Sequence, residues 1–329
     1  MTDCQTNACD ATTLTFSAPE ATGAVVRLSA WGMVKLSGKD ARDFLQRVLT
    51  NEVIHLGSKH ALTGYCDPKG RLLGTMRYWL TGETDVMMMI PKSSAPAIIK
   101  RLKMFVLRDD VTIDCAMEGR TLWAITRKAH DVLAKAGLPV AGVDEVATSD
   151  TATVLGLRAA VDNETLGVGA DRALVVTNAD FAWPCGKNCA LEPNNAQFFA
   201  SEILAGMPSV FAPTSGLFVP QAVNLDLVDG VSFTKGCYPG QEVVSRLKHV
   251  GKTNRRGFVS LTTGDVPAPG ADVYAEGSTD PVGYVVYAAK VGDVVAVMTS
   301  NLIDARNAGL KLTLDGAVMT PVTLPYALD

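Results

Sequence analysis

Hydrophobic and polar residues follow two different spacings in the first part of the chain. Residues 24–36 alternate between the two kinds, which predicts a strand with a bend at Gly32. Residues 37–53 instead place apolar side chains at helical spacing, with Ser37 as the N-cap. The apolar stripe of this expected helix consists of Phe44, Leu45, Val48 and Leu49.

The pattern that follows predicts an antiparallel hairpin, a further strand and a second helix. Residues 61–80 form two apolar blocks around the turn sequence Asp67-Pro68-Lys69-Gly70. Residues 84–91 have the pattern of a strand, and residues 93–107 have that of a helix. We therefore expect an α+β subdomain over roughly residues 33–115, not a βαβ-wound one.

The pattern changes again towards the C-terminal end. A helix is expected at residues 194–208, capped by Asn194 or Asn195. The blocks that come after residue 257 are short, apolar and separated by Gly, Asp and Pro, which predicts an antiparallel barrel or sandwich. The pattern thus predicts an α+β region at 24–250, followed by an all-β region at 251–329 that is a barrel or a sandwich.

Composition narrows the class of protein. The 329 residues, 47% hydrophobic and 19% charged, can form two or three globular domains. No apolar run approaches the roughly 18 residues that cross a bilayer, and the N-terminal residues resemble neither a signal peptide nor a transit peptide. We therefore expect a cytoplasmic protein that does not bind membranes. Its net charge of −4 argues against direct binding to nucleic acid.

The seven cysteines are scattered, and in a cytoplasmic chain they are expected to be reduced thiols. Cys185 and Cys189 form the only close pair in the sequence. Their CxxxC spacing has no second ligand pair and no nearby histidine, so we expect no metal site there.

One stretch concentrates unusual chemistry: GVSFTKGCYPGQEVVSRLKHVGKTNRRG, residues 230–257. Its first four residues are expected to be a strand and residues 242–246 the start of a helix, so Cys237 lies on the loop between them. Both Lys235 and the helix N-terminus would stabilise a thiolate there. The pattern is typical of a nucleophilic, redox-active or metal-ligating thiol. A small buried thiol in a turn is the alternative.

The same stretch is rich in positive charge, opposed there only by Glu242. This indicates an anionic ligand or partner, with a solvated surface as the alternative. A Cys–His hydrolase has little support, because His249 lies 12 residues after Cys237. The basic residues are Lys235, Arg246, Lys248, Lys252, Arg255 and Arg256.

At these residues the chain resembles the YgfZ family, folate-binding proteins that support iron–sulfur cluster enzymes. The family signature K-G-C-[YF]-x-G-Q-E-x-x-x-R is complete as KGCYPGQEVVSR, Lys235 to Arg246. The preceding FVPQAVNLDLVDGVSF also resembles the family's lead-in, and AWGMVKLSGKDARDFLQRVLTNEV and YCDPKGRLLGTMRYW fall where its N-terminal segments fall. The likeness extends from about Ser29 to Phe258.

The resemblance implies a glycine-cleavage T-protein-like fold, with three domains around a central hole for tetrahydrofolate. It implies two interleaved α+β subdomains at 24–250, of which the one at roughly 33–115 is ferredoxin-like, and a C-terminal β-barrel at 251–329. It implies that Cys237 is the functional thiol, with Lys235 and Arg246 beside it. For folate contacts it implies an aromatic pair, of which Trp31 matches the first and Phe198 replaces a tryptophan as the second. The remaining expected cofactor-binding residues are Tyr238, Gln241 and Glu242.

Two departures from the T-protein pattern argue against aminomethyl transfer. The turn that carries the catalytic aspartate corresponds to GRLLGT, where Gly74 and Thr75 cannot ionise. The glutamate that holds the pterin corresponds to Leu204, which cannot accept a hydrogen bond, and Glu202 stands where an arginine is expected. If the protein is an enzyme at all, a folate-dependent one-carbon transferase is the class implied.

The expected function is therefore a folate-linked factor for assembly or repair of iron–sulfur clusters, with Cys237 as its central thiol. Its partners would be iron–sulfur client or assembly proteins, including tRNA-thiolating enzymes. The thiol would shuttle a redox or one-carbon equivalent, or transiently ligate iron. The alternatives are an aminomethyltransferase of the T-protein type and a folate-binding protein without thiol chemistry.

Overall fold

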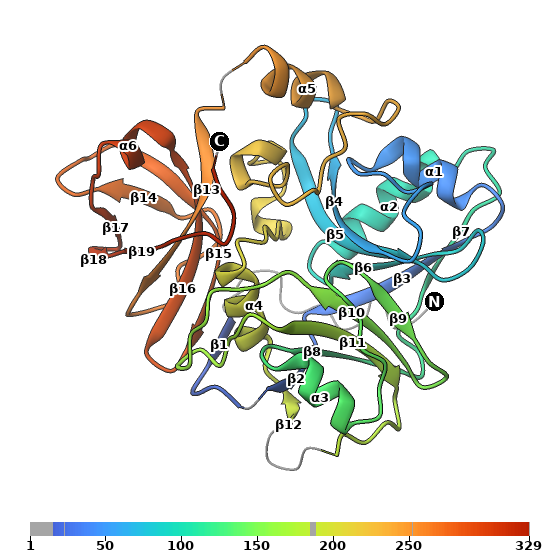
Figure 1. The fold of residues 1–329 in the computed structure, drawn as a ribbon. Coiled ribbons are helices and arrows are strands. Elements are labelled where there is room, and N and C mark those ends of the chain that lie inside the picture. The colour runs from blue at the N-terminus through green and yellow to red at the C-terminus, as the bar shows by residue number, and fades with distance from the viewer. Residues whose placement is uncertain (1–15, 23, 185–188, 252, 329) are drawn as a thin grey trace.

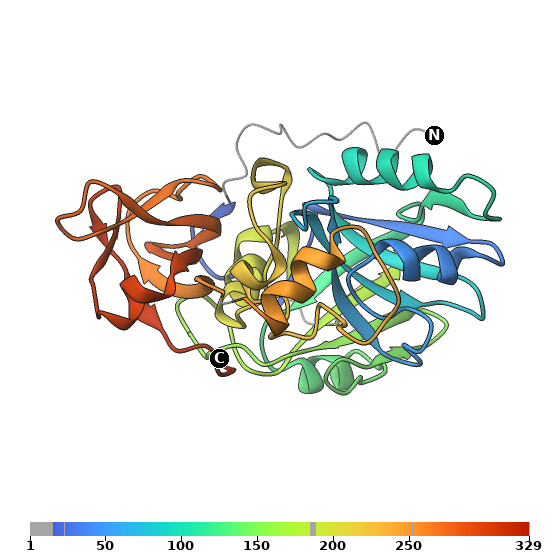
Figure 2. The same cartoon turned by 90° about the horizontal axis from the view of Figure 1, so that it is seen from above.

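The computed structural model describes residues 16–22, 24–184, 189–251 and 253–328. Three β-sheets surround a central helix, α4 (Asn195–Leu204) (Figure 1). Seen from above, the C-terminal sheet and the N-terminal sheet lie at opposite ends, with α4 and the segments after it between them (Figure 2). The predicted α+β class, with an all-β C-terminal part, is confirmed.

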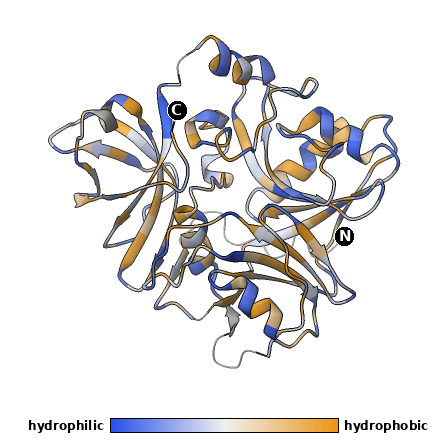
Figure 3. Cartoon of the chain, viewed as in Figure 1, coloured by the Kyte–Doolittle hydropathy of each residue, from blue (hydrophilic) through white to orange (hydrophobic). Residues whose placement is uncertain are grey.

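The N-terminal sheet has the strand order β4-β5-β6-β3-β7 and packs against two helices. The predicted hairpin is present as its longest pair, β4 with β5. Helix α1 carries both hydrophilic and hydrophobic residues (Figure 3), and its buried side chains are Ala41, Phe44, Leu45 and Val48, as expected of an amphipathic helix. The elements are β3 (Trp31–Ser37), α1 (Ala41–Val48), β4 (His60–Cys66), β5 (Leu72–Leu80), β6 (Val86–Pro91), α2 (Ala95–Phe105) and β7 (Thr112–Cys115).

The middle sheet has the order β12-β2-β8-β11-β10-β9 and packs against α3 (Ala129–Lys135). Its edge strand β12 and its neighbour β2 run parallel, whereas the other pairs are antiparallel. The strands are β2 (Val25–Arg27), β8 (Arg120–Ile125), β9 (Val146–Thr148), β10 (Ala152–Leu157), β11 (Arg172–Asn178) and β12 (Cys189–Pro193).

The C-terminal sheet is a nearly closed barrel of order β18-β17-β14-β15-β16-β13-β19. An N-terminal strand, β1 (Phe16–Ala18), joins it by pairing in parallel with β15. The other elements are β13 (Arg255–Thr262), β14 (Asp272–Ala275), β15 (Pro281–Val291), β16 (Val294–Leu302), α6 (Ile303–Asn307), β17 (Leu312–Leu314), β18 (Ala317–Val318) and β19 (Thr320–Val322).

Helix α4 holds the three sheets together. All its residues from Ala196 to Leu204 are buried, as expected for a helix enclosed on every side. The main hydrophobic core runs through it and takes in side chains of all three sheets. Asn194 caps the helix by accepting a hydrogen bond from the Gln197 N–H at 3.1 Å. Two short 3₁₀ turns, η2 (Ala212–Thr214) and η3 (Pro220–Val223), then lead to α5 (Gln241–His249).

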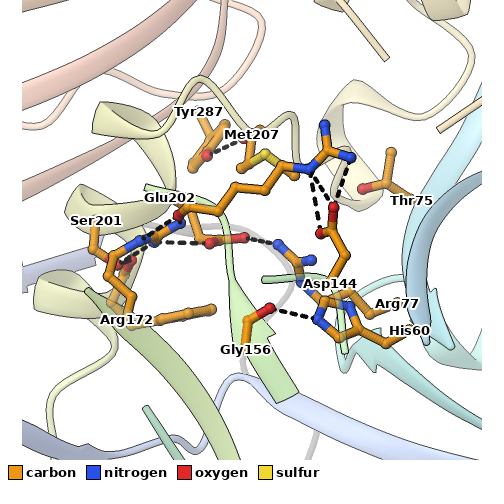
Figure 4. Close-up of polar contacts among 12 residues, drawn as sticks. His60, Thr75, Arg77, Asp144, Gly156, Arg172, Ser201, Glu202, Met207 and Tyr287 are labelled. Atoms are coloured by element: carbon orange, nitrogen blue, oxygen red, sulfur yellow. Dashed lines mark hydrogen bonds and ion pairs between the residues drawn. The ribbon is translucent and has the colours of Figure 1, made fainter. Parts of the chain in front are cut away.

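A buried ion-pair triad connects α4 to two sheets. Glu202 on α4 accepts from Arg77 on β5 at 2.8 Å and from Arg172 on β11 at 3.0 Å. Figure 4 shows the carboxylate between the two guanidinium groups. Burial alone would raise the pKa of Glu202, but the two arginines hold that pKa below its ordinary value.

The expected strand at 24–36 is wrong in one respect. It is divided into β2 and β3, which belong to different sheets, and Gly32 lies inside β3. The break has a physical cause: the N–H groups of Ser29 and Ala30 both donate to Asn195 Oδ1, at 2.9 and 3.0 Å, so they leave the strand ladder. The first helix begins at Ala41, with Asp40 and not Ser37 as its N-cap residue.

The expected strand at residues 230–233 is also wrong, because these residues form no strand. The segment is held by isolated backbone bonds, from Gly230 N–H to Leu225 O and from Ser232 N–H to Thr50 O. The segment that leads to Cys237 is therefore held in place without strand pairing.

Cys115 is disulfide-bonded, so the expectation of reduced thiols is wrong for this residue. Cys66 and Cys237 are free. None of the helices in the described ranges has the length and hydropathy of a membrane span. The expectations for the first 15 residues, for Cys185 and for Lys252, and those for the side chain of Cys189, fall outside the described residues.

Replacing Glu202 by Gln is expected to lower the free energy of unfolding by roughly 3–5 kcal/mol, since two buried guanidinium groups lose their shared counter-charge. Urea unfolding at neutral pH measures the change. The matched control is Glu242→Gln, because Glu242 pairs with Arg246 at 3.4 Å on the surface. Equal stabilities for the two variants would contradict the importance of the triad.

Candidate functional site: an anchored thiol loop and a central cavity

The loop before α5 is fixed at both sides of Cys237, while Cys237 itself is exposed. On one side, Lys235 is 8% exposed and its Nζ donates to Leu49 O at 2.8 Å and to Asn51 O at 2.7 Å. On the other side, the buried ring of Tyr238 lies 5.7 Å from Lys235 Nζ. Because the residues on both sides are buried and held in place, the Cys237 thiol is exposed to solvent. The alternative of a buried structural thiol is therefore excluded.

Gly240 explains part of the sequence signature. It has φ +81°, and an added Cβ would lie 2.5 Å from Asp67 O and 2.6 Å from Gly70 Cα. The β4–β5 turn thus packs directly on the loop. Asp67 Oδ1 holds that turn by accepting from the N–H groups of Lys69 and Arg71, at 2.8 and 2.9 Å. Gly236, in contrast, has open space around it.

The remaining signature residues lie on the first turns of α5, a helix that the sequence predicted correctly. Gln241 Nε2 donates to Gly236 O at 3.4 Å, which closes the loop. Glu242 and Arg246 form an exposed i,i+4 pair, the kind that contributes little to stability.

The basic stretch does not form a single surface. Arg256 is buried and donates to Asp226 Oδ1 at 2.7 Å and to Gln221 O at 3.0 Å. Arg255 lies over the ring of Tyr284, 5.2 Å from its centroid. The expected anionic partner would therefore meet mainly the α5 part of the stretch.

A cavity of about 370 Å³ lies where the N-terminal sheet, the middle sheet and the segments after α4 meet, and we call it the central cavity. The barrel contacts one residue of the cavity wall, since Tyr287 Oη on β15 donates to Met207 O at 2.6 Å. Its wall includes Asn51, Glu52, His55, His60, Leu62, Arg77, Asp144, Arg158, Met207 and Asp229. Because Lys235 binds Asn51 O, the Cys237 loop is attached to this wall.

His60 is the most unusual group in the wall. It is 2% exposed, and its Nε2 lies 2.8 Å from Gly156 O. Burial, with Arg77 as the next cause, lowers the pKa of His60 to about 4. The ring is therefore neutral near pH 7, and its Nδ1 has no hydrogen-bond partner among the described residues.

Arg158 forms ion pairs with two acidic residues of the cavity wall. Its Nε donates to Asp144 Oδ2 at 2.9 Å, and its Nη2 donates to Asp229 Oδ2 at 2.8 Å. Asp144 precedes β9 of the middle sheet and Asp229 follows η3, so the network joins two parts of the chain across the wall. Figure 4 shows Asp144 above Arg77 and His60.

The eight residues predicted from the sequence separate into two groups. Six lie on the thiol loop and α5. Trp31 and Phe198 pack edge to face in the core, with ring centroids 6.4 Å apart and exposures of 3% and 1%. No described residue of either group lines the central cavity. Their roles towards folate remain predictions. The six are Lys235, Cys237, Tyr238, Gln241, Glu242 and Arg246.

The residues that line the cavity are not among those predicted from the sequence. One signal was available: Arg77 is a charged residue inside the apolar strand LLGTMRYWL, where a cation is found only with a partner. His60 gave no comparable signal, because its environment is made by Gly156, far away in the sequence.

The structure explains why no ionisable residue stands at the expected aspartate position. Thr75 is buried, and its Oγ1 accepts from the Val210 N–H at 3.0 Å. A Cβ on Gly74 would lie 2.5 Å from Ile98 Cδ1. Neither position therefore has room for a larger, ionisable side chain without rearrangement of its neighbours.

Sequence similarity to known proteins identifies the family of this chain. The chain is 30% identical to "tRNA-modifying protein YgfZ" of Serratia proteamaculans (strain 568) over 316 residues, which cover 92% of each chain. The protein of the same name from Enterobacter sp. (strain 638) is 29% identical over 93% of this chain and 94% of its own. The chain belongs to the YgfZ family. No protein-family profile matches it.

The fold also matches a solved structure, the glycine cleavage system aminomethyltransferase T from Bartonella henselae. The TM-score is 0.64 over 94% of this chain and 87% of that one, at 16% identity. At this identity the match shows the fold alone. The predicted T-protein-like fold is thus confirmed for this member of the YgfZ family.

Lys235→Met is expected to lower the free energy of unfolding by about 1–3 kcal/mol, because Leu49 O and Asn51 O lose their donor inside the protein. Urea unfolding tests this expectation. Lys69→Met is the control, since Lys69 is exposed in the neighbouring turn. If both variants are as stable as the parent, Lys235 is not the anchor of the loop.

The lowered pKa of His60 makes stability depend on pH. Below the ordinary value of 6.5 the unfolded chain binds a proton that the folded protein refuses until about pH 4. Stability should therefore fall as the pH drops from about 6.5 to 4, by up to about 3 kcal/mol from this group. Unfolding curves across this window, compared with those of His60→Gln, measure the contribution. Parallel curves would show that His60 is not buried as a neutral ring.

Proposed function

We propose that this protein is a folate-linked factor that supports assembly or repair of iron–sulfur clusters in client enzymes, with Cys237 as its working thiol. The observation that carries the proposal is the thiol loop: Lys235, Tyr238 and Gly240 fix its backbone, and the sulfur is left exposed. Such a thiol can reach a partner protein without a conformational change. Membership of the YgfZ family supports a link to tRNA modification, which the names of the relatives state.

The central cavity supports the folate part of the proposal. Its volume of about 370 Å³ lies within the range of roughly 300–1,000 Å³ usual for small-molecule sites. Two buried side chains in its wall, His60 and Arg77, have unused hydrogen-bonding capacity within the described part of the chain. Bound there, folate would supply one-carbon or redox chemistry, while the residues of this chain would bind and orient it.

Asn51 joins the thiol loop to the cavity wall. Its backbone O accepts a hydrogen bond from Lys235 Nζ, and its side chain donates to Leu62 O at 2.9 Å and to Asp229 O at 2.6 Å. Asn51, Leu62 and Asp229 all line the cavity. A change in that wall would therefore be transmitted to the thiol loop through few atoms. This arrangement favours a thiol that acts together with the cavity over a simple folate store.

An aminomethyltransferase of the T-protein type is less well supported. Gly74 and Thr75 supply no carboxylate, and packing fixes both positions. The second alternative, a folate-binding protein without thiol chemistry, leaves the anchored and exposed Cys237 without a role.

The test is complementation with Cys237→Ser in a host that lacks its own copy of the protein. The activity of a cluster-dependent tRNA-thiomethylating enzyme is expected to fall to the level of the empty vector, while folate binding and the melting temperature stay near those of the parent. Cys66→Ala is the matched control: Cys66 is buried, and its pKa is raised to about 12 by burial, so it is no nucleophile. Full activity of Cys237→Ser would refute the role of the thiol.

A further inference from the structure

Two buried polar side chains of the central cavity are neighbours on one face of the N-terminal sheet. In the β4–β5 pair, His60 is opposite Trp79 and Leu62 is opposite Arg77. His60 and Arg77 are therefore diagonal neighbours, the arrangement in which long side chains of adjacent strands meet. Figure 4 shows them close together below Asp144. They are 2% and 3% exposed, and both line the cavity.

His60 supplies a hydrogen-bond acceptor. Gly156 O can only accept, so the His60 Nε2 that lies 2.8 Å from it must carry the proton. In a neutral ring Nδ1 is then an acceptor, and it has no partner among the described residues. The lowered pKa of His60 keeps the ring in this state at neutral pH. An unpaired buried acceptor is costly, which is typical of a position that a ligand completes.

Arg77 supplies donors. A guanidinium group has five N–H donors. In the described structure the Arg77 side chain donates one hydrogen bond, from Nη2 to Glu202 Oε2. Glu202 is shared with Arg172, which makes its own bonds to Glu202 Oε1, to Ser201 Oγ and to Arg158 O. Arg77 is thus the member of the triad that turns towards the cavity with donors to spare.

A ligand that satisfies both groups must donate and accept at adjacent atoms. A carboxylate only accepts, so it would leave His60 Nδ1 unpaired. A ring amide, N–H beside C=O, satisfies both, and fused pyrimidinone rings such as pterin and guanine carry this edge.

We propose that His60 Nδ1 accepts the ring N–H, and Arg77 donates to the adjacent carbonyl, of a fused pyrimidinone bound in the central cavity. The assignment rests on the proposed function, which places a folate there, and it identifies the pterin as the end of the folate that enters. It also gives the pterin an acceptor that Leu204 cannot provide, since Leu204 is an apolar side chain buried in the core.

The experiment measures binding of 5-formyltetrahydrofolate and of its N3-methyl derivative to the full-length protein by isothermal titration calorimetry. In the parent protein, N3-methylation is expected to weaken binding about 10- to 100-fold, because the ring N–H is lost. His60→Phe is expected to weaken binding of the unmethylated ligand by a similar factor and to make the protein indifferent to methylation. His130→Phe is the matched control and should leave both affinities unchanged, because His130 is exposed on α3 and is not part of the cavity wall.

Each outcome has a distinct meaning. If the parent protein binds folate and neither methylation nor His60→Phe matters, the pyrimidinone assignment is wrong and the proposed function stands. If guanosine binds with the same dependence on His60 and folate does not bind, the assignment stands and the folate part of the proposed function fails. Binding of neither ligand overturns both. Should His60→Phe fail to fold, His60→Gln, which removes the Nδ1 acceptor but keeps a polar group towards Gly156 O, takes its place in the same comparison.

Discussion

The architecture depends on one buried carboxylate. Glu202 lies on the central helix and binds Arg77 of the N-terminal sheet and Arg172 of the middle sheet, so a single side chain fixes two sheets to α4. Such groups cost desolvation energy, and removing one member leaves the others buried without their counter-charge. The triad carries one net positive charge, and Arg77 brings it to the cavity wall. The same interaction therefore fixes two sheets to the central helix and holds Arg77 at the cavity wall.

In the thiol loop Cys237 is exposed, while its neighbours Lys235 and Tyr238 are buried. Lys235 is buried with its ammonium bound to two carbonyls, so its role visible in the structure is to hold the loop. Burial lowers the pKa of Lys235 to about 8, which is consistent with an ammonium removed from water. Gly240 permits the close contact with the β4–β5 turn that completes the anchorage. Lys235, Tyr238 and Gly240 thus fix the loop, and the Cys237 side chain remains exposed.

The relation to the aminomethyltransferase illustrates that a fold does not determine its chemistry. The two chains share a fold at 16% identity. In this protein, however, Thr75 is tied to Val210 and Leu204 is part of the core, so the positions expected to be acidic carry packing instead. The buried polar side chains that line the cavity are His60 on β4 and Arg77 on β5.

Local sequence determined the elements whose signals are local: the hairpin around Asp67–Gly70, the cap at Asn194 and the helix after Cys237. It also determined the class of the fold and, through the signature, the family. Only the tertiary structure decided that residues 24–36 serve two sheets, because the side chain that interrupts them belongs to Asn195. For the same reason only the structure decided the cavity: His60 owes its state to Gly156, and Arg77 owes its charge balance to Glu202. These partners lie about a hundred residues away, beyond the reach of any pattern of local spacing.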